Sequence, residues 1–308
     1  MNWDRVLYPL DLVGCNLLGR RFVGAVDIDG VLEVGKDLKK RGFGVTYNLL
    51  GEHVHDLVPV DKAVDSTLRL IRGMQNENLG NVSCKPTLYG LSISKTLFIK
   101  NIEEIIELAR QKEIEIEFDA ENYSYIEDTF DVFSSFASQK IYSNTVRQAV
   151  QAHLKDILPL MGKYQLWDKS LRIVKGAGVY NETNTSIVTN DNEKIRQKYF
   201  EILRGNIVAG RTPFTATVRD RELAESVIKI TGEGASLFEF QMLYGPLGRK
   251  LGECLLRSDY PVRVYIPFTD YWCHDVWKSY GLRRAKMMRN LLLSNFKCAT
   301  LDRIGKGH

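Results

Sequence analysis

Residues Phe43–Leu49 have the sequence FGVTYNL, the first of a series of short runs rich in β-branched and aromatic residues. Such runs are typical of buried β-strands. A helix-compatible segment, Asp61–Met74, follows this run, and the same alternation recurs along the chain. The later runs are Val82–Pro86, Ile114–Phe118, Ile141–Val146, Leu171–Val174, Pro213–Thr217, Leu237–Gln241 and Val262–Pro267. This alternation of strands and helices predicts an α/β protein, a (β/α)8 barrel of the TIM type.

The segments between these runs carry helical signals. Ile102–Lys112 has apolar residues at the i, i+3, i+4, i+7 spacing of one helix face, and Asn101 is its predicted N-cap. Asp191–Leu203 is a further predicted helix. A doubly wound open sheet is the rival fold, but it would normally carry a GxGxxG turn, and none follows Phe43–Leu49.

The predicted domain organisation follows from the position where the alternation of strands and helices begins. Residues 1–40 are predicted to form an N-terminal helical prefix, which ends near Gly42, and residues 41–308 to form one barrel domain. No low-complexity segment or Pro-rich linker divides the chain.

Composition excludes several classes of protein. The formal net charge is only +4 and there is no block of like charge, so a nucleic-acid role is not indicated. The five cysteines form no CxxC pair and no HExxH is present, so we expect no metal site. There is neither a signal-peptide pattern nor a run of 18 apolar residues. We therefore expect a cytoplasmic protein, with peripheral contact at the inner membrane left open.

Polar side chains gather where the predicted strands end, which is where TIM-type barrels carry their sites. They include Glu52, Lys85, Asp119, Arg147, Gln151, Lys175, Thr217, Gln241 and Tyr265. No GxSxG elbow and no phosphate-binding GxxxxGK[ST] loop accompanies them. This many cationic and amide groups without an obvious nucleophile favours a bound anionic cofactor.

One further motif lies near the C-terminus. Tyr280 and Arg283 are three residues apart, so they would share a helix face, and Arg284 lies next to them. Two guanidinium groups suit a carboxylate, because each presents a planar fork of donors. On spacing alone, the alternative is the solvated basic face of a helix.

In order along the chain, these motifs resemble those of the proline dehydrogenase family. The resemblance covers about residues 40–295. Its motifs are Tyr47–Glu52, Ser83–Thr87, Phe118–Glu121, Val150–Ala152, Arg172–Ala177, Phe238–Gly245, Val262–Pro267 and Tyr280–Arg284. It implies a distorted barrel that holds FAD noncovalently and oxidises L-proline to 1-pyrroline-5-carboxylate by hydride transfer. The electrons would pass to a membrane quinone. A separate pyrroline-5-carboxylate dehydrogenase would act on the product, because no second catalytic domain is present.

The resemblance also implies roles for individual residues. Asp119, Tyr280, Arg283 and Arg284 would be the catalytic set. Lys85, Arg283 and Arg284 would bind the substrate carboxylate. The substrate ring would pack against Leu243, Tyr265 and Tyr280. Asp119 would orient these groups. Arg147 and Gln151 would face the flavin ring. The rest of the FAD would be lined by Lys175, Gly176, Ala177 and Thr217.

The sequence departs from the family pattern at several positions. His153 stands where a tyrosine is usual, Val218 replaces a histidine, Gly178 and Val179 precede Tyr180, and Met287 replaces a glutamate. These changes leave two alternatives open: oxidation of another cyclic secondary amino acid such as hydroxyproline, or a non-catalytic flavin- or ligand-binding barrel. They also predict a pH response near 6 to 7 from His153, if it keeps roughly its reference pKa.

Overall fold

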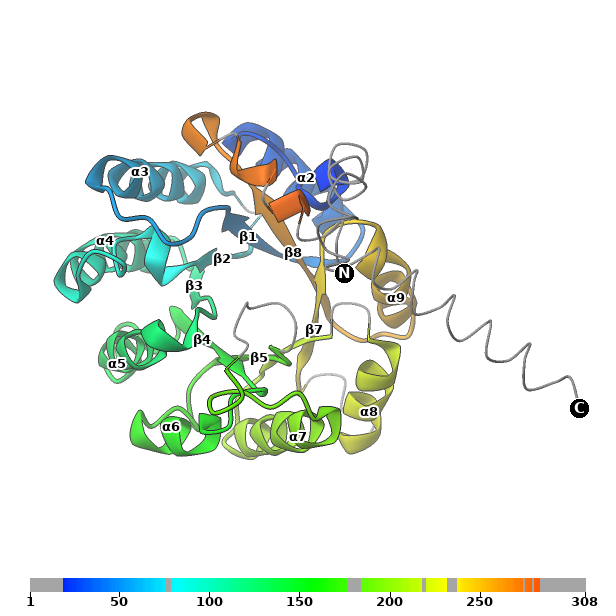
Figure 1. The fold of residues 1–308 in the computed structure, drawn as a ribbon. Helices are drawn as coiled ribbons and strands as arrows, with labels where there is room; N and C mark the ends of the chain where they lie inside the picture. Colours follow the sequence, from blue (N-terminus) through cyan, green and yellow to red (C-terminus); the bar gives the residue numbers. More distant parts are fainter. Residues whose placement is uncertain are drawn as a thin grey trace, which may run out of the picture.

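The computed structural model is a closed barrel of eight parallel strands that pair in sequence order, with β8 closing on β1 (Figure 1). The structure describes residues 19–75, 79–176, 184–217, 220–231, 237–273, 275–278 and 280–282. The strands are β1 Gly44–Leu49, β2 Asn81–Cys84, β3 Glu115–Phe118, β4 Val146–Gln151, β5 Leu171–Val174, β6 Phe214–Ala216, β7 Glu239–Leu243 and β8 Val262–Phe268. The (β/α)8 prediction is confirmed.

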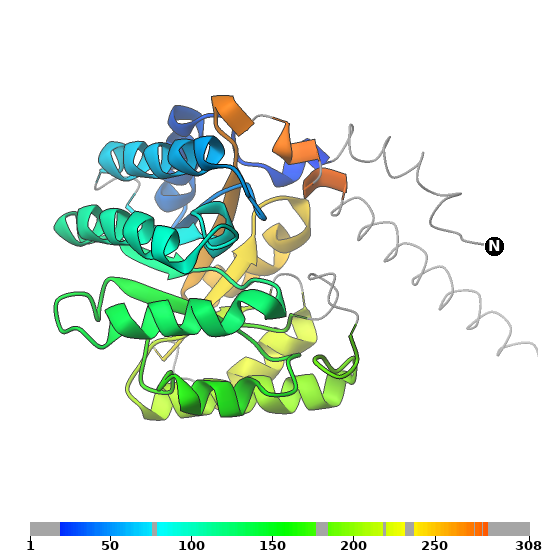
Figure 2. The same cartoon turned by 60° about the vertical axis from the view of Figure 1, so that its left-hand side comes forward.

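A layer of helices covers the outside of the barrel (Figures 1 and 2). The described helices are α2 Ile28–Lys40, α3 Leu57–Gly73, α4 Lys95–Gln111, α5 Ile126–Ala137, α6 Ile157–Lys163, α7 Asn192–Val208, α8 Arg221–Thr231 and α9 Pro246–Arg257. Short 3-10 turns are η1 Gly19–Phe22, η2 Pro86–Leu88, η3 Tyr123–Tyr125 and η4 Tyr271–Cys273. The helix α2 precedes the first strand and packs on β1, β8 and α3, so it completes the outer layer at the closing seam.

The sequence-based bounds of the fourth strand and the N-cap of the helix α4 are wrong. The fourth strand is Val146–Gln151, and Ile141 lies in the preceding turn with 55% of its surface exposed. The predicted run Ile141–Val146 begins with an apolar residue, but the fourth strand pairs with β3 only from Val146 onward, where Val146 lies opposite Ile116. The cap of α4 is Ser94, whose hydroxyl accepts from the Leu97 amide, while Asn101 lies inside the helix and donates to the Tyr89 carbonyl.

The apolar core lies between the strands and the helices. In β3, for example, Ile116 and Phe118 are buried there, and Phe118 packs edge-on against Phe98 of α4 and Phe133 of α5. The alternate residues of each strand point into the barrel. Contacts between strands that are not neighbours establish this, such as Gln241 of β7 with Thr46 of β1.

The inside of the barrel is polar along much of its length. At the end where the strands begin, Arg147 pairs with Glu115 at 2.7 Å and Arg263 pairs with Glu239 at 3.1 Å. Both guanidinium groups contact the ring of Phe214, with their central carbons 3.5 and 4.4 Å from its centroid. These paired charges and the aromatic ring fill the base of the barrel, opposite the end where the strands finish.

The segment before α2 lies against the finishing end of β8. The Gly24 amide donates to the Pro267 carbonyl at 2.8 Å, and Ala25 forms a parallel bridge with Phe268. A Cβ on Gly24 would come within 2.4 Å of the Ile266 side chain, so this close approach requires glycine. The chain between Gly19 and Ala25 thus extends the seam of the barrel at the end where the strands finish.

Candidate active site

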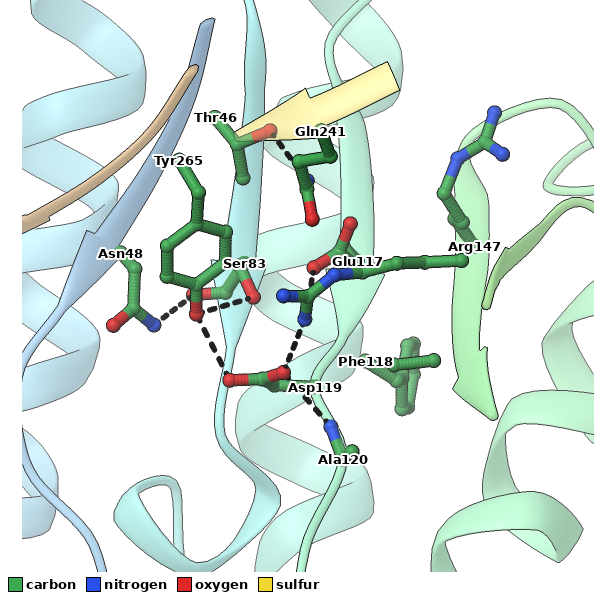
Figure 3. Close-up of polar contacts among 12 residues, drawn as sticks. Thr46, Asn48, Ser83, Glu117, Phe118, Asp119, Ala120, Arg147, Gln241 and Tyr265 are labelled. Atoms are coloured by element: carbon green, nitrogen blue, oxygen red, sulfur yellow. Dashed lines mark hydrogen bonds and ion pairs between the residues drawn. The ribbon is translucent and has the colours of Figure 1, made fainter. Parts of the chain in front are cut away.

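Asp119, the residue immediately after β3, lies at the centre of a cluster of charges inside the barrel (Figure 3). Its Oδ2 lies 3.0 Å from Nζ of Lys85 and accepts a 2.9 Å hydrogen bond from the Tyr265 hydroxyl. Its Oδ1 accepts from Nη1 of Arg172 at 2.6 Å and from the Ala120 amide at 2.9 Å. One carboxylate therefore organises two cations and a phenol.

The barrel register brings these residues together. Lys85 and Asp119 follow neighbouring strands, β2 and β3, and the Asp119 amide continues the ladder by donating to the Cys84 carbonyl at 2.9 Å. Arg172 reaches the same carboxylate from β5, across the inside of the barrel. Its guanidinium carbon lies 4.7 Å from the centroid of the Tyr265 ring on β8. The cluster therefore joins four strands at the end where TIM-type barrels carry their sites.

The charges of this cluster set its protonation. Burial alone would raise the pKa of Asp119, but Lys85 and Arg172 lower it below its usual range. Burial, and then the Asp119 charge, raise the pKa of Tyr265 well above its usual value. Near neutral pH Asp119 is therefore an anion and Tyr265 a neutral hydrogen-bond donor.

Sequence reasoning gave no role to Arg172 or to Glu117, which the structure places directly in this site. Arg172 belongs to a motif that the sequence singled out, and its position two residues before Val174 puts it on the inner face of β5. Glu117 is fully buried, and its Oε1 lies 3.2 Å from Nη1 of Arg172. Strand alternation backwards from Asp119 would have found Glu117, because residues two apart share a face.

The predicted cofactor residues Gln151, Lys175 and Thr217 lie at the ends of three successive strands, β4 to β6. The Gln151 amide donates to the Glu121 carbonyl at 3.2 Å, and Lys175 pairs with Asp220 at 2.9 Å. Gly176 has a φ of +84°, which favours glycine. Ala177 lies outside the described residues.

A patch of small apolar side chains separates these donors from the charged cluster. Ala120, Ala149, Val174 and Ala216 form a cluster of their own, apart from the main core. A small hollow between β3, β4 and α5 is lined by Asp119, Ala149 and Gln151 together with Ile126, Thr129 and Phe130 of α5. Small apolar side chains next to amide, ammonium and hydroxyl groups suit a planar heterocycle with polar edges and an anionic tail. The residues present therefore fit a flavin nucleotide.

Arg147 is not where the sequence predicted. It is the second residue of β4 instead of following the strand, and it points away from Asp119 in Figure 3. Its guanidinium is held by Glu115 and donates to the carbonyls of Leu171 and Thr212 at 2.8 and 3.2 Å. These partners belong to the base of the barrel, so the position gives no support to a contact with a flavin.

His153 does not have the pKa that a pH response near neutrality needs. Burial, and then the charge of Lys198, lower the pKa of His153 to about 4. The imidazole packs against Gly176, where an added Cβ would come within 1.9 Å of its Nδ1. His153 is therefore neutral at physiological pH, and the predicted titration near pH 6 to 7 is wrong.

Some of the residues predicted to contact the substrate lie within the described part of the chain. Leu243 ends β7, and Tyr265 lies in β8 beside Asp119. Tyr280 is buried in a small cluster with Phe22, Val23 and Leu50. Arg283 and Arg284 lie outside the described residues.

No group of three or more His, Cys, Asp or Glu side chains is arranged to hold a metal ion among the residues that the structure describes. Over the same part of the chain, no helix combines the length and the apolar character needed to cross a membrane.

The fold and this cluster define a TIM-type barrel whose charged site lies at the end where its strands finish. Residues 31–286 match the model of the proline dehydrogenase family. Proline dehydrogenase 1 of Bacillus subtilis strain 168 is 28% identical over 276 residues, covering 88% of this chain and 87% of the relative. Proline dehydrogenase of Deinococcus radiodurans is 26% identical over 262 residues, covering 83% of each chain.

Solved structures share the fold. Proline utilization A from Bdellovibrio bacteriovorus, inactivated by N-propargylglycine, superposes with a TM-score of 0.73 at 18% identity. The match covers 87% of this chain and 32% of that protein, so this chain spans about a third of its length. With the family match over most of its length, the chain belongs to the proline dehydrogenase family.

Proposed function

We propose that this protein is an FAD-dependent dehydrogenase that oxidises L-proline to 1-pyrroline-5-carboxylate. The observation that carries the proposal is the ion cluster of Asp119, Lys85 and Arg172 beside the buried Tyr265 ring. It lies at the functional end of a barrel of the proline dehydrogenase family. The cluster offers fixed cations for a carboxylate and an aromatic wall for a small ring.

The substrate carboxylate would be held first by Lys85. An ammonium group has three donors, so Lys85 can keep its contact with Asp119 and still bind a second carboxylate. Asp119 fixes the direction of that ammonium, which orients the substrate. Arg283 and Arg284 would complete the clamp from the C-terminal motif. Fixed cations hold the ring in one orientation, which is a proximity effect.

The ring of the substrate would lie against Leu243, Tyr265 and Tyr280. All three side chains are at least 90% buried. A secondary amine in such surroundings loses its charge more easily, because burial disfavours the ammonium form. The neutral amine is the form that can lose a hydride from the adjacent carbon.

The flavin would be held by Gln151, Lys175, Gly176, Ala177 and Thr217 along the ends of β4 to β6. When bound, FAD supplies the acceptor for the two electrons and the hydrogen. Arg172 replaces Arg147 in this proposal, because Arg172 extends past the small apolar patch toward Asp119. Its positive charge there favours the developing negative charge of a reduced acceptor.

We also propose the place of the reaction. A membrane quinone would reoxidise the flavin, which fits a cytoplasmic protein that touches the inner membrane peripherally. The product would pass to a separate pyrroline-5-carboxylate dehydrogenase.

The first experiment measures the cofactor and the substrate together. Purified protein is expected to show flavin absorbance, to release FAD identified by mass, and to reduce a dye acceptor with L-proline. A colourless protein that takes up no added FAD would contradict the proposal. Faster turnover of hydroxyproline would favour the first alternative, and a flavin that no amino acid reduces would favour the non-catalytic barrel.

A further inference from the structure

Glu117 is a buried carboxylate to which the proposed reaction gives no role. It lies on the inner face of β3, one pleat below Asp119, and none of its surface is exposed. The two carboxylates share one partner: Nη1 of Arg172 lies 2.6 Å from Asp119 Oδ1 and 3.2 Å from Glu117 Oε1. Figure 3 shows Glu117 and Asp119 close to each other inside the barrel.

The two carboxylates are not held equally. Asp119 receives the shorter contact of Arg172 together with Lys85, the Tyr265 hydroxyl and the Ala120 amide. Glu117 receives only the longer contact of Arg172 as an ion pair among the described residues. A fully buried anion with weak compensation is the one that takes up a proton when negative charge is added nearby.

The groups around Glu117 also favour its protonated form. Burial raises the pKa of Glu117, and Asp119 adds to this, while Arg172, Arg147 and the Ser83 hydroxyl oppose it without cancelling it. Asp119 and Tyr265 do not take the proton instead, because the pKa of Asp119 is lowered and Tyr265 is already protonated, its pKa being raised. Burial also raises the pKa of Glu121, but this carboxylate accepts two hydrogen bonds from Thr87, which oppose the shift. Lys85, the remaining charge of the cluster, pairs with Asp119.

Lys85 and Arg172 contact Asp119, and Arg172 also contacts Glu117. A carboxylate ligand beside Lys85 brings a further negative charge close to both acids, whichever other cations hold it, and this charge raises the pKa of Glu117 further. We propose that Glu117 is a positioning residue that takes up one proton from solvent when an anionic carboxylate ligand binds beside Lys85. Its neutralisation releases the guanidinium of Arg172 from one of its two carboxylates. This inference rests on the proposed function.

The test is calorimetric titration of the holoenzyme with tetrahydrofuran-2-carboxylate, a proline analogue without a titrating amine. Titration near pH 7.5 in two buffers of different ionisation enthalpy gives the number of protons exchanged on binding. The wild type is expected to take up a fraction of a proton approaching about one, and its affinity to fall with rising pH by at most about tenfold per unit. Glu117→Gln is expected to bind without proton uptake.

Glu115→Gln is the matched control. Glu115 lies on the inner face of the same strand and pairs with an arginine, but it belongs to the base of the barrel. This variant should take up protons as the wild type does. Equal uptake in wild type and Glu117→Gln, or no uptake by the wild type, would overturn the inference while leaving the proposed function intact. No binding to the wild type at any pH would contradict the proposed function, and this inference with it.

A second measurement needs no ligand. Because the folded-state pKa of Glu117 is raised, the ionised carboxylate weakens the fold increasingly as the pH rises above the unfolded value of about 4.3. The melting temperature of Glu117→Gln relative to wild type should therefore increase between pH 5 and pH 8. A difference that stays constant over this range would overturn the inference, because Glu117 would then hold no extra proton in the folded protein.

Discussion

At the scale of single residues, the site depends on Asp119 more than on any other described side chain. It accepts from a phenol and an amide and pairs with two cations, all from within the barrel. Its lowered pKa means that these contacts stabilise the ionised form. The same contacts that fix the geometry of Lys85 and Arg172 therefore also contribute to the stability of the fold.

Asp119→Asn tests this double role. Removing one charge from a buried, hydrogen-bonded cluster should cost at least about 2 kcal/mol in kcat/KM for L-proline, roughly 30-fold. The variant should also be less stable at pH 7. Because the folded pKa of Asp119 is lowered, its contribution is present above the unfolded pKa and is lost as the pH falls toward the folded value. Melting curves should thus converge in acid; a constant gap would contradict this.

The arginine motif lies outside the described residues and stays a prediction of the sequence. If Arg283 binds the substrate carboxylate, Arg283→Lys replaces a planar fork by a point charge. The expected loss is about 2–4 kcal/mol in kcat/KM, roughly 30- to 1,000-fold, with unchanged flavin content. Steady-state oxidation of L-proline measures it. Wild-type kinetics in Arg283→Lys and Arg284→Lys would leave the motif as a solvated helix face.

At the scale of elements, the N-terminal segment supports the site. Phe22 of η1 is fully buried against Tyr280, and Gly24 and Ala25 bond to the end of β8. Gly245, at the end of β7, also closes on this segment: a Cβ there would come within 2.9 Å of Phe22 and of the Arg21 carbonyl. The segment before α2 therefore sets where Tyr280 lies.

Phe22→Leu should loosen Tyr280 without unfolding the barrel. A volume-reducing apolar swap of this kind costs about 1 kcal/mol of stability. The KM for L-proline should rise while flavin content stays the same. Phe136→Leu is the control, because Phe136 is equally apolar and buried but packs in the outer core of α5. Equal KM values in both variants would contradict the idea that Phe22 positions Tyr280.

At the base of the barrel we expect a substitution to lower stability without changing catalysis. Arg147→Met leaves Glu115 and two carbonyls without their donor. Breaking a largely buried pair in this way should cost about 3 kcal/mol of stability, with normal flavin content and kcat/KM per folded molecule. Arg249→Met, which removes an exposed pair with Glu253, should change little. Flavin loss at unchanged stability would instead restore the role that the sequence predicted for Arg147.

At the scale of the whole molecule, hydrophobic periodicity was enough to predict the barrel, because each strand buries one face against helices. The fourth strand was misplaced because its inner face carries Arg147 and Gln151, so β4 lacks the continuous apolar run of a typical parallel strand. Glu117 was missed for the same reason. The alternation of polar and apolar residues in Glu115, Ile116 and Glu117 is typical of a strand with one face in solvent. In this protein the polar face of β3 instead lies toward the charged interior of the barrel.

Motif order along the chain gave the family, but it could not distinguish two arginines at different depths in the barrel. Arg147 and Arg172 are each the second residue of a strand, β4 and β5 respectively. Only the register between β3, β4 and β5 shows that one reaches Asp119 and the other Glu115. The pKa of His153 was equally out of reach, because it depends on burial and on Lys198, a residue of α7 far away in sequence.

The most direct test of the central claim is single-turnover reduction of the bound flavin by L-proline with both hydrogens at C5 replaced by deuterium. Mixed anaerobically with the holoenzyme, this substrate should bleach the flavin more slowly than ordinary L-proline. The product should be 1-pyrroline-5-carboxylate that keeps one of its two deuterium atoms. A flavin that stays oxidised with either substrate, or a product that keeps both deuterium atoms, would contradict the account.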